Sequence, residues 1–101
     1  MPIKVLVSGT GKMGREVLAA ACREPDLEPV GVLDRVSGEE NLSLPDGSGL
    51  VPFSTDPAAL FTRTRPDVVV DFTNAEYTPQ VARAALEAGA RLVIGTSGLS
   101  W

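Results

Sequence analysis

Short apolar runs alternate along this chain with longer segments in which apolar residues recur every three or four positions. The runs are typical of strands buried on both faces of a parallel sheet, and the longer segments are typical of amphipathic helices. Strands are therefore expected at about residues 3–8, 28–34, 51–54, 67–72 and 91–95. Helices are expected at about residues 14–24, 57–63 and 77–88, the last with Val81, Ala82, Ala85 and Leu86 on its apolar face. This alternation predicts an α/β domain with a parallel sheet of about five strands.

Residue types that begin or end helices support these boundaries. Thr55 or Asp56 can cap the second helix, which has Pro57 in its first turn, and Gly89 is placed to close the third helix. The polar stretch at residues 36–50 contains several glycines and serines. For that stretch we expect a mobile, irregular connector.

Composition and charge exclude several classes of function. The 101 residues fit one domain, and a net charge of −4 leaves no basic surface for nucleic acid or an anionic membrane. The chain contains no histidine, which excludes imidazole catalysis and histidine-ligated metal within it. Cys22, the single cysteine, cannot form an intrachain disulfide and is expected in the core. The lone cysteine indicates a reducing, cytoplasmic setting. No apolar run approaches the roughly 20 residues that span a bilayer, so we expect a soluble protein.

The glycines after the first predicted strand carry the strongest functional signal. Gly9, Gly11 and Gly14 have the G-x-G-x-x-G spacing, and they lie between a strand and a helix within one βαβ unit. In a dinucleotide-binding turn, the first glycine permits a tight turn and the second lets the backbone approach a pyrophosphate. The third allows close packing of helix on strand, and the helix amino terminus attracts the anion. The alternative is that these glycines only connect the strand to the helix.

The residues between the glycines are further candidate cofactor contacts. Thr10 lies within the turn itself. Lys12 places a cation beside the diphosphate, or else remains solvated. Met13 is expected to pack between helix and sheet while keeping some contact with the cofactor.

Asp34 ends the second predicted strand, twenty residues after Gly14. In the dinucleotide-binding pattern, this acid accepts hydrogen bonds from both hydroxyls of the adenosine ribose. Asp34 would repel the 2′-phosphate of NADPH, whereas the guanidinium of Arg35 would bind it. We therefore expect the chain to use both NADH and NADPH. The alternative is that Asp34 and Arg35 form an ion pair with each other.

Two more segments follow the last two predicted strands, at the edge where open α/β sheets bind ligands. Phe72 is expected to border the nicotinamide or the pyrophosphate. For Asp71, turn formation or capping is the favoured interpretation. Hydroxyl and amide groups that can contact the carboxamide or a substrate come from Thr73, Thr96 and Ser97.

Taken in order, the segments G-T-G-K-M-G, D-R, V-V-V-D-F-T and V-I-G-T-S-G-L-S resemble the dihydrodipicolinate reductase family, also called 4-hydroxy-tetrahydrodipicolinate reductase. The likeness covers nearly the whole chain outside residues 36–50. It implies that residues 1–101 are a Rossmann-type NAD(P)-binding domain. The family's enzymes transfer a hydride from NADH or NADPH to a cyclic imine diacid in lysine and diaminopimelate biosynthesis, usually as tetramers. The implied cofactor contacts are Gly9 to Met13, Asp34, Arg35, Phe72, Thr73 and Gly95 to Ser97.

Two departures from the family pattern bear on function. The family's usual turn is G-x-x-G-R-M-G, whereas here Ser8 stands where the first glycine would lie, Gly9 compensates, and Lys12 replaces arginine. The family's catalytic histidine and lysine belong to a carboxyl-terminal substrate domain, and this chain has no histidine. The resemblance therefore implies a cofactor-binding domain that ends before the substrate domain and is inactive by itself.

Other functions fit the same residues. One is another NAD(P)-dependent dehydrogenase, and another is a dinucleotide-binding module without turnover. A methyltransferase that uses S-adenosylmethionine shares the glycine turn and the acid after the second strand. Met13 and Gly14 at the start of the helix, and Arg35 beside the acid, disfavour the methyltransferase.

Overall fold

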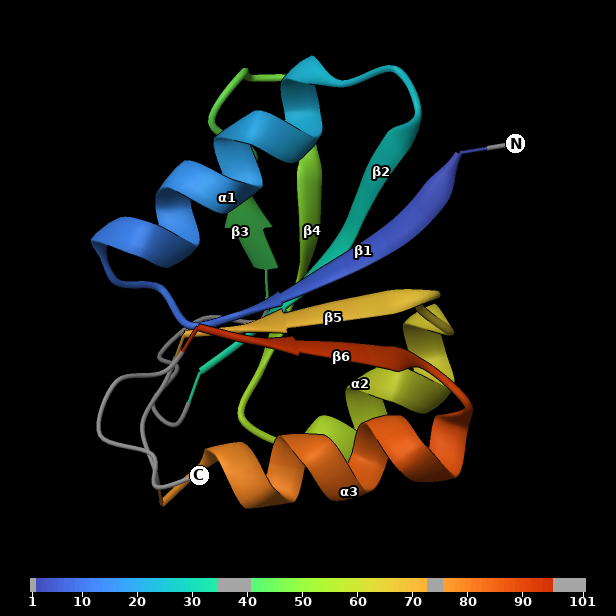
Figure 1. Ribbon diagram of the computed structural model, residues 1–101. Helices are drawn as coiled ribbons and strands as arrows, with labels where there is room; N and C mark the ends of the chain where they lie inside the picture. The colour runs from blue at the N-terminus through green and yellow to red at the C-terminus, as the bar shows by residue number, and fades with distance from the viewer. Residues whose placement is uncertain (1, 35–40, 73–75, 96–101) are drawn as a thin grey trace.

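The computed structural model describes residues 2–34, 41–72 and 76–95, and within them the chain forms an α/β domain (Figure 1). In chain order the elements are β1 (Ile3–Ser8), α1 (Lys12–Arg23), β2 (Leu27–Leu33), β3 (Asn41–Ser43), β4 (Leu50–Ser54), α2 (Pro57–Thr64), β5 (Val68–Asp71), α3 (Thr78–Ala88) and β6 (Arg91–Ile94). All the predicted strands and helices are confirmed, with shifts of one or two residues at their ends.

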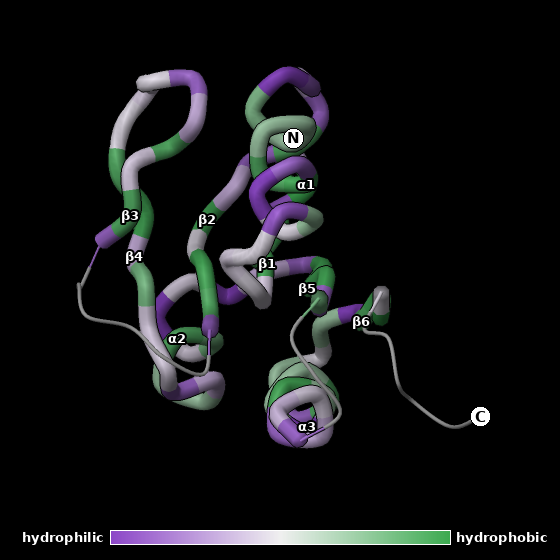
Figure 2. Tube along the Cα trace, turned by 90° about the vertical axis from the view of Figure 1, so that its left-hand side faces the viewer, coloured by the Kyte–Doolittle hydropathy of each residue, from purple (hydrophilic) through white to green (hydrophobic). Residues whose placement is uncertain are grey.

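The strands form one sheet in the order β3-β4-β2-β1-β5-β6. Every neighbouring pair is parallel except β3 and β4, which are antiparallel. Helix α1 lies against one face of the sheet, and α2 and α3 lie against the other (Figures 1 and 2). This is the layered arrangement that alternating strands and helices predict.

The expectation of an irregular connector at residues 36–50 is wrong at β3, which adds a sixth strand. Asn41, Leu42 and Ser43 pair with the beginning of β4 through a tight connection in which Gly47 has a φ of 75°. The strand has only three residues, and only Leu42 among them is apolar. Its pairing with β4 therefore leaves almost no trace in the pattern of apolar residues.

Alternating side chains of β1 supply both halves of the core. Val5 and Val7 pack on the α1 side with Leu18 and Val32, and Leu6 packs on the opposite side beneath α2 and α3. Because successive side chains of a strand point to opposite faces, a sheet that helices cover on both faces requires the continuous apolar run seen in β1. The same run is what predicts this strand from the sequence.

Three expectations about individual side chains are wrong or only partly right. Met13 is 53% exposed and Leu86 is 82% exposed, so neither packs in the core. Each lies one residue from a buried position, Gly14 and Ala85 respectively, and a helix turns by about 100° per residue. Cys22 is half-buried rather than fully buried, and burial, followed by the nearby Asp46 carboxylate, raises the pKa of its thiol.

Candidate functional site

The carboxyl ends of β1, β2, β5 and β6 meet at one edge of the sheet, where the predicted site residues gather (Figure 1). Backbone hydrogen bonds join the segments that leave these strands. The amide of Gly9 donates to the Leu33 carbonyl at 2.6 Å, and the amide of Phe72 donates to the Ser8 carbonyl at 2.7 Å. The amide of Gly95 donates to the Asp71 carbonyl at 2.8 Å. Four predicted site residues lie outside the described residues: Arg35, Thr73, Thr96 and Ser97.

The space for a Cβ atom and the backbone φ angle differ among the three glycines of the first turn. A Cβ atom on Gly14 would lie 2.1 Å from the carbonyl oxygen of Gly9, so the close approach of α1 to the turn excludes any side chain there. Gly9 has a φ of 120°, and its Cβ would lie 3.1 Å from the backbone of Phe72. At Gly11 a Cβ would have no neighbour within 4 Å, and φ is −70°. The fold therefore requires Gly9 and Gly14, whereas nothing in the described structure requires glycine at position 11.

The amino terminus of α1 is electrostatically unlike that of α2. Gly11 supplies no side-chain cap to α1, and the first turn contains no acidic residue. It contains Lys12 instead, and Arg15 follows immediately. In α2, by contrast, the side chain of Asp56 accepts a hydrogen bond from the amide of Ala59 at 3.3 Å, which confirms one of the two predicted caps. Cations beside a positive helix end are unfavourable unless an anion joins them.

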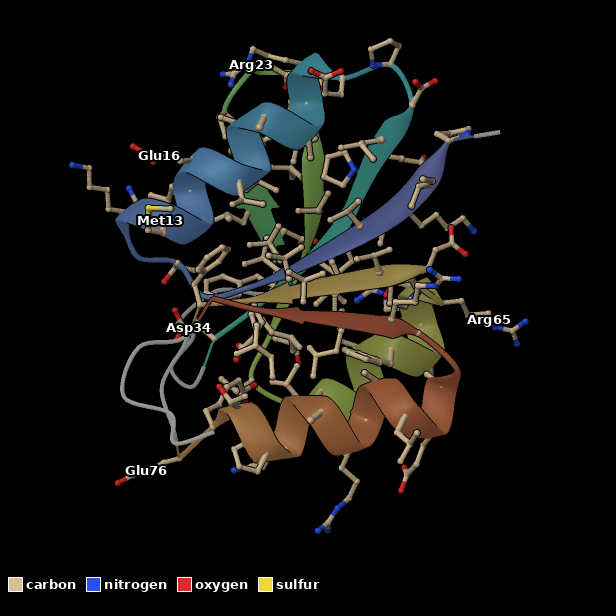
Figure 3. All side chains as sticks on the ribbon, viewed as in Figure 1. Met13, Glu16, Arg23, Asp34, Arg65 and Glu76 are labelled. Carbon is tan, nitrogen blue, oxygen red and sulfur yellow. The ribbon has the colours of Figure 1, made fainter. Side chains whose placement is uncertain are left out.

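Asp34 is bonded to the glycine turn. Its Oδ2 accepts a hydrogen bond from the amide of Thr10 at 2.8 Å and a second one from the Thr10 hydroxyl. The amide of Asp34 donates to the Ser54 carbonyl at 3.2 Å, which ties the end of β2 to the end of β4. Figure 3 shows Asp34 at the edge where the turn leaves β1. The acid predicted to bind ribose and the turn predicted to bind diphosphate are thus one connected unit.

Arg15 also belongs to this unit, although the pattern of glycines did not indicate it. Its Nε donates to the carbonyl oxygen of Thr10 at 3.0 Å, which brings the guanidinium back over the turn. Helical side chains point toward the amino terminus of their helix, so a long residue in this turn can cover the residues before it. Because Arg15 is a long cationic residue four positions after Gly11, this side-chain direction could have identified it from the sequence.

Phe72 links the glycine turn to the end of β6. A Cβ on Gly95 would lie 2.1 Å from Cε1 of the Phe72 ring, so the ring lies directly over this glycine. The backbone of Phe72 in turn faces Gly9. Packing against the Phe72 ring thus explains why residue 95 is glycine. A contact of Phe72 or Gly95 with a cofactor stays a prediction.

Asp71 has the structural role that the sequence favoured. It is fully buried, and it accepts a hydrogen bond from the hydroxyl of Thr78, the first residue of α3. Nearby, the hydroxyl of Tyr77 donates to the Thr55 carbonyl at 2.9 Å. Burial, followed by the negative charges of Asp34, Asp71 and Asp56, raises the pKa of Tyr77 to about 12. These bonds fix the start of α3 against the sheet.

Membrane-spanning helices and metal-binding clusters are both absent from the described part of the chain. None of its helices combines the length and the apolar character needed to cross a membrane. Within the same residues, no group of three or more histidine, cysteine, aspartate or glutamate side chains is arranged to hold a metal ion.

Comparison with known proteins identifies the family. The family model described as "Dihydrodipicolinate reductase, N-terminus" matches residues 3–101. The chain belongs to this family. A 4-hydroxy-tetrahydrodipicolinate reductase from Dehalococcoides mccartyi is 47% identical over 100 residues, which are 98% of this chain and 38% of the relative. The enzyme of that name from Bacillus subtilis is 39% identical, over 97% of this chain and 38% of its own length. The chain therefore spans less than half the length of these reductases.

Solved structures agree with this assignment. A dipicolinate-bound dihydrodipicolinate reductase from Paenisporosarcina sp. TG-14 matches with a TM-score of 0.79 and 30% identity, over 99% of this chain and 39% of that chain. An amine dehydrogenase from Mycobacterium smegmatis matches with a TM-score of 0.75 and 26% identity, over 93% of this chain and 30% of that chain. A Rex-family repressor, RSP, in complex with β-NADH matches with a TM-score of 0.74 at 14% identity, which shows a common fold alone.

Proposed function

We propose that this chain binds NADH or NADPH and serves as the cofactor domain of a 4-hydroxy-tetrahydrodipicolinate reductase. The diphosphate would bind at the turn formed by Gly9–Gly14 and at the first amides of α1. The adenosine ribose would bind at Asp34. Family membership supports the reaction class, and the geometry of the turn supports the place of binding.

The open space at Gly11 is the observation that carries this proposal. Two of the three glycines are required by contacts inside the chain, whereas Gly11 has an ordinary φ and no neighbour within 4 Å of its missing Cβ. Glycine loses more backbone entropy than alanine on folding, and at an N-cap residues with a capping side chain, such as serine or aspartate, are the most favourable. A ligand that must approach the backbone closely is the physical reason for such a residue.

Charge at the turn supports the same ligand. Lys12 and Arg15 lie at the amino terminus of a helix whose dipole already disfavours cations, and that terminus has no side-chain cap. A diphosphate would neutralise both side chains and accept hydrogen bonds from the first amides of α1. The dinucleotide, when bound, would supply the hydride for the reduction.

For the whole reductase, we propose that the groups that bind and protonate the substrate lie in a region corresponding to the rest of the longer relatives. The matching family model is specific to the amino-terminal part of the reductase, and this chain covers 38% of two relatives' lengths. By itself, the chain should then bind the dinucleotide without oxidising it. Rapid oxidation of NADPH by this chain alone, with 4-hydroxy-tetrahydrodipicolinate present, would contradict this division of roles.

Alanine at position 11 tests the place of binding. The Gly11→Ala variant should fold like the original chain, because its Cβ meets nothing, but its affinity for NADH should fall by about tenfold or more if the methyl group displaces the diphosphate. Gly31→Ala is the matched control: it lies in β2, and its Cβ would make ordinary contacts at 3.4 Å and beyond. Titration by NADH fluorescence measures both affinities, and thermal unfolding verifies the fold.

Two outcomes would overturn the proposal. The first is Gly11→Ala binding NADH as tightly as the original chain. The second is the original chain binding S-adenosylmethionine but neither dinucleotide, which would favour the methyltransferase. If Gly31→Ala loses as much NADH affinity as Gly11→Ala, the effect of alanine is not specific to position 11.

A further inference from the structure

Thr10 is held through its amide, its hydroxyl and its carbonyl oxygen. The amide and hydroxyl both donate to Oδ2 of Asp34, and the carbonyl accepts from Nε of Arg15 at 3.0 Å. Both Thr10 and Asp34 are partly buried, so solvent competes less with these bonds than it would at an exposed site. The residue therefore joins the end of β2 to the start of α1.

The Thr10 hydroxyl restricts how the Asp34 carboxylate can rotate. The amide of Thr10 already donates to Oδ2, the same carboxylate oxygen that the hydroxyl reaches. The hydroxyl adds a second bond from Thr10 to that oxygen, while the bond from the Asp34 amide to Ser54 fixes the backbone. Carboxylates held by several donors keep one orientation, and this order precedes any ligand.

We infer that Thr10 is a positioning residue whose hydroxyl orients the Asp34 carboxylate toward the ribose 2′ position and so favours NADH over NADPH. This inference rests on the proposed function, because it assigns the ribose to Asp34. An oriented carboxylate accepts bonds from a ribose diol without further loss of rotational freedom. The same fixed negative charge opposes a 2′-phosphate.

The two dinucleotides should respond differently when the hydroxyl is removed. NADH loses a pre-oriented acceptor, so its affinity falls. Without the hydroxyl, the carboxylate can turn away from the 2′-phosphate of NADPH, so the affinity for NADPH stays the same or rises. A general loosening of the glycine turn would instead weaken both dinucleotides, since both place the same diphosphate there.

Valine and serine at position 10 separate these effects. Thr10→Val has nearly the same shape but no hydroxyl, and Thr10→Ser keeps the hydroxyl. Thr62→Val is the matched control, because Thr62 lies on the exposed side of α2 and its hydroxyl donates to the Ala58 carbonyl. Dissociation constants for NADH and NADPH are measured by fluorescence titration of each preparation. Their ratio within one preparation does not depend on the fraction of chain that is folded.

In Thr10→Val, we expect the dissociation constant for NADH to rise by about 5- to 20-fold, while that for NADPH stays within about twofold of the original value or falls. Thr10→Ser and Thr62→Val should both keep the original ratio. An unchanged ratio in Thr10→Val, whether both affinities fall together or neither falls, overturns the role of Thr10 and leaves the proposed function standing. If the original chain binds neither dinucleotide, the proposed function itself fails.

Discussion

The aromatic ring of Phe72 covers Gly95 so closely that a Cβ atom at position 95 would lie 2.1 Å from a ring carbon. This contact joins the segment after β5 to the end of β6. The amide of Gly95 also donates to the carbonyl of Asp71, the residue just before Phe72. The two strand ends are therefore held by one backbone bond and one packing contact at the edge where the candidate site lies.

Alanine at position 95 should displace the Phe72 ring. We expect Gly95→Ala to lower the free energy of unfolding by about 1–3 kcal/mol, as overpacking does elsewhere. In a Phe72→Ala background the same change should cost much less, because the clashing ring is absent. A double-mutant cycle by urea unfolding measures this coupling. Equal costs in the two backgrounds would mean that the ring does not rest on Gly95.

Neutral residues at the start of α1 should weaken ligand binding, and at position 12 the change should also stabilise the chain. In Lys12→Gln, an unfavourable interaction with the helix dipole disappears, so the free energy of unfolding without ligand should rise by about 0.3–1 kcal/mol. In Arg15→Gln, loss of the bond from Nε to the Thr10 carbonyl offsets this gain. The affinity for NADH should fall in both variants.

Arg23→Gln provides the control for charge. It removes a cation from the opposite end of the same helix, far from Met13 in Figure 3, where the dipole favours positive charge. Stability should therefore fall slightly and NADH affinity should stay unchanged. If Arg23→Gln weakens NADH as much as Arg15→Gln, the effect is one of net charge rather than of position.

Arg65 is the one described non-glycine residue with positive φ, at 47°, where it ends α2. The left-handed backbone conformation costs an L-residue about 1 kcal/mol or more. Part of this cost is offset because unfolded arginine has less backbone entropy than unfolded glycine. Arg65→Gly should therefore stabilise the chain by about 0.5 kcal/mol. Gly89→Ala, at the matching end of α3 with a φ of 74°, should destabilise it by about 1 kcal/mol. Thermal unfolding checks both signs, and a loss of stability in Arg65→Gly would contradict the argument.

Tyr77 should make the stability of the chain fall in strongly alkaline solution. Its pKa is raised to about 12 in the folded chain from the ordinary value of 10.0. The folded chain thus keeps a proton that the unfolded chain loses, so this contribution is complete below about pH 10 and disappears as the pH rises through about 12. Tyr77→Phe should lack this loss, although it also removes the bond to Thr55.

Two measurements check the titration of Tyr77. Tyrosinate absorbance reports this residue alone, because it is the sole tyrosine of the chain. Urea unfolding at a series of alkaline pH values gives the stability. A midpoint of titration at the ordinary value, or the same pH dependence in Tyr77→Phe, would be inconsistent with the buried environment.

The sequence predicted the larger elements of the fold because each has a repeating physical signature. The apolar run in β1 and the regular spacing of Val17, Leu18 and Ala21 in α1 arise from burial on a sheet. Strand β3 lacks such a signature, since its three residues are held mainly by backbone bonds to β4. Met13 and Leu86 were misjudged because an apolar residue one position from a buried one faces a different direction.

The spacing of residues in the sequence predicted which residues form the candidate site, but not the hydrogen bonds between them. The positions of Gly9–Gly14 and of Asp34 after β2 followed from the order of strand, helix and strand. The bonds from Thr10 to Asp34, and from Arg15 to Thr10, join side chains and backbone across the turn. The bonds to Asp34 have no sequence pattern of their own, because they depend on how the end of β2 approaches the turn. The bond from Arg15 follows from the direction of helical side chains toward the amino terminus.

The most direct test of the central claim is a titration of this chain, labelled with nitrogen-15, with NADH while its amide resonances are observed by NMR. If the diphosphate binds the start of α1, the amides of Gly11, Lys12 and Met13 should shift most, together with that of Thr10. The amides of α2 should remain in place. Saturable shifts confined to another surface, or no shift at millimolar NADH, would contradict the claim that this turn is a dinucleotide site.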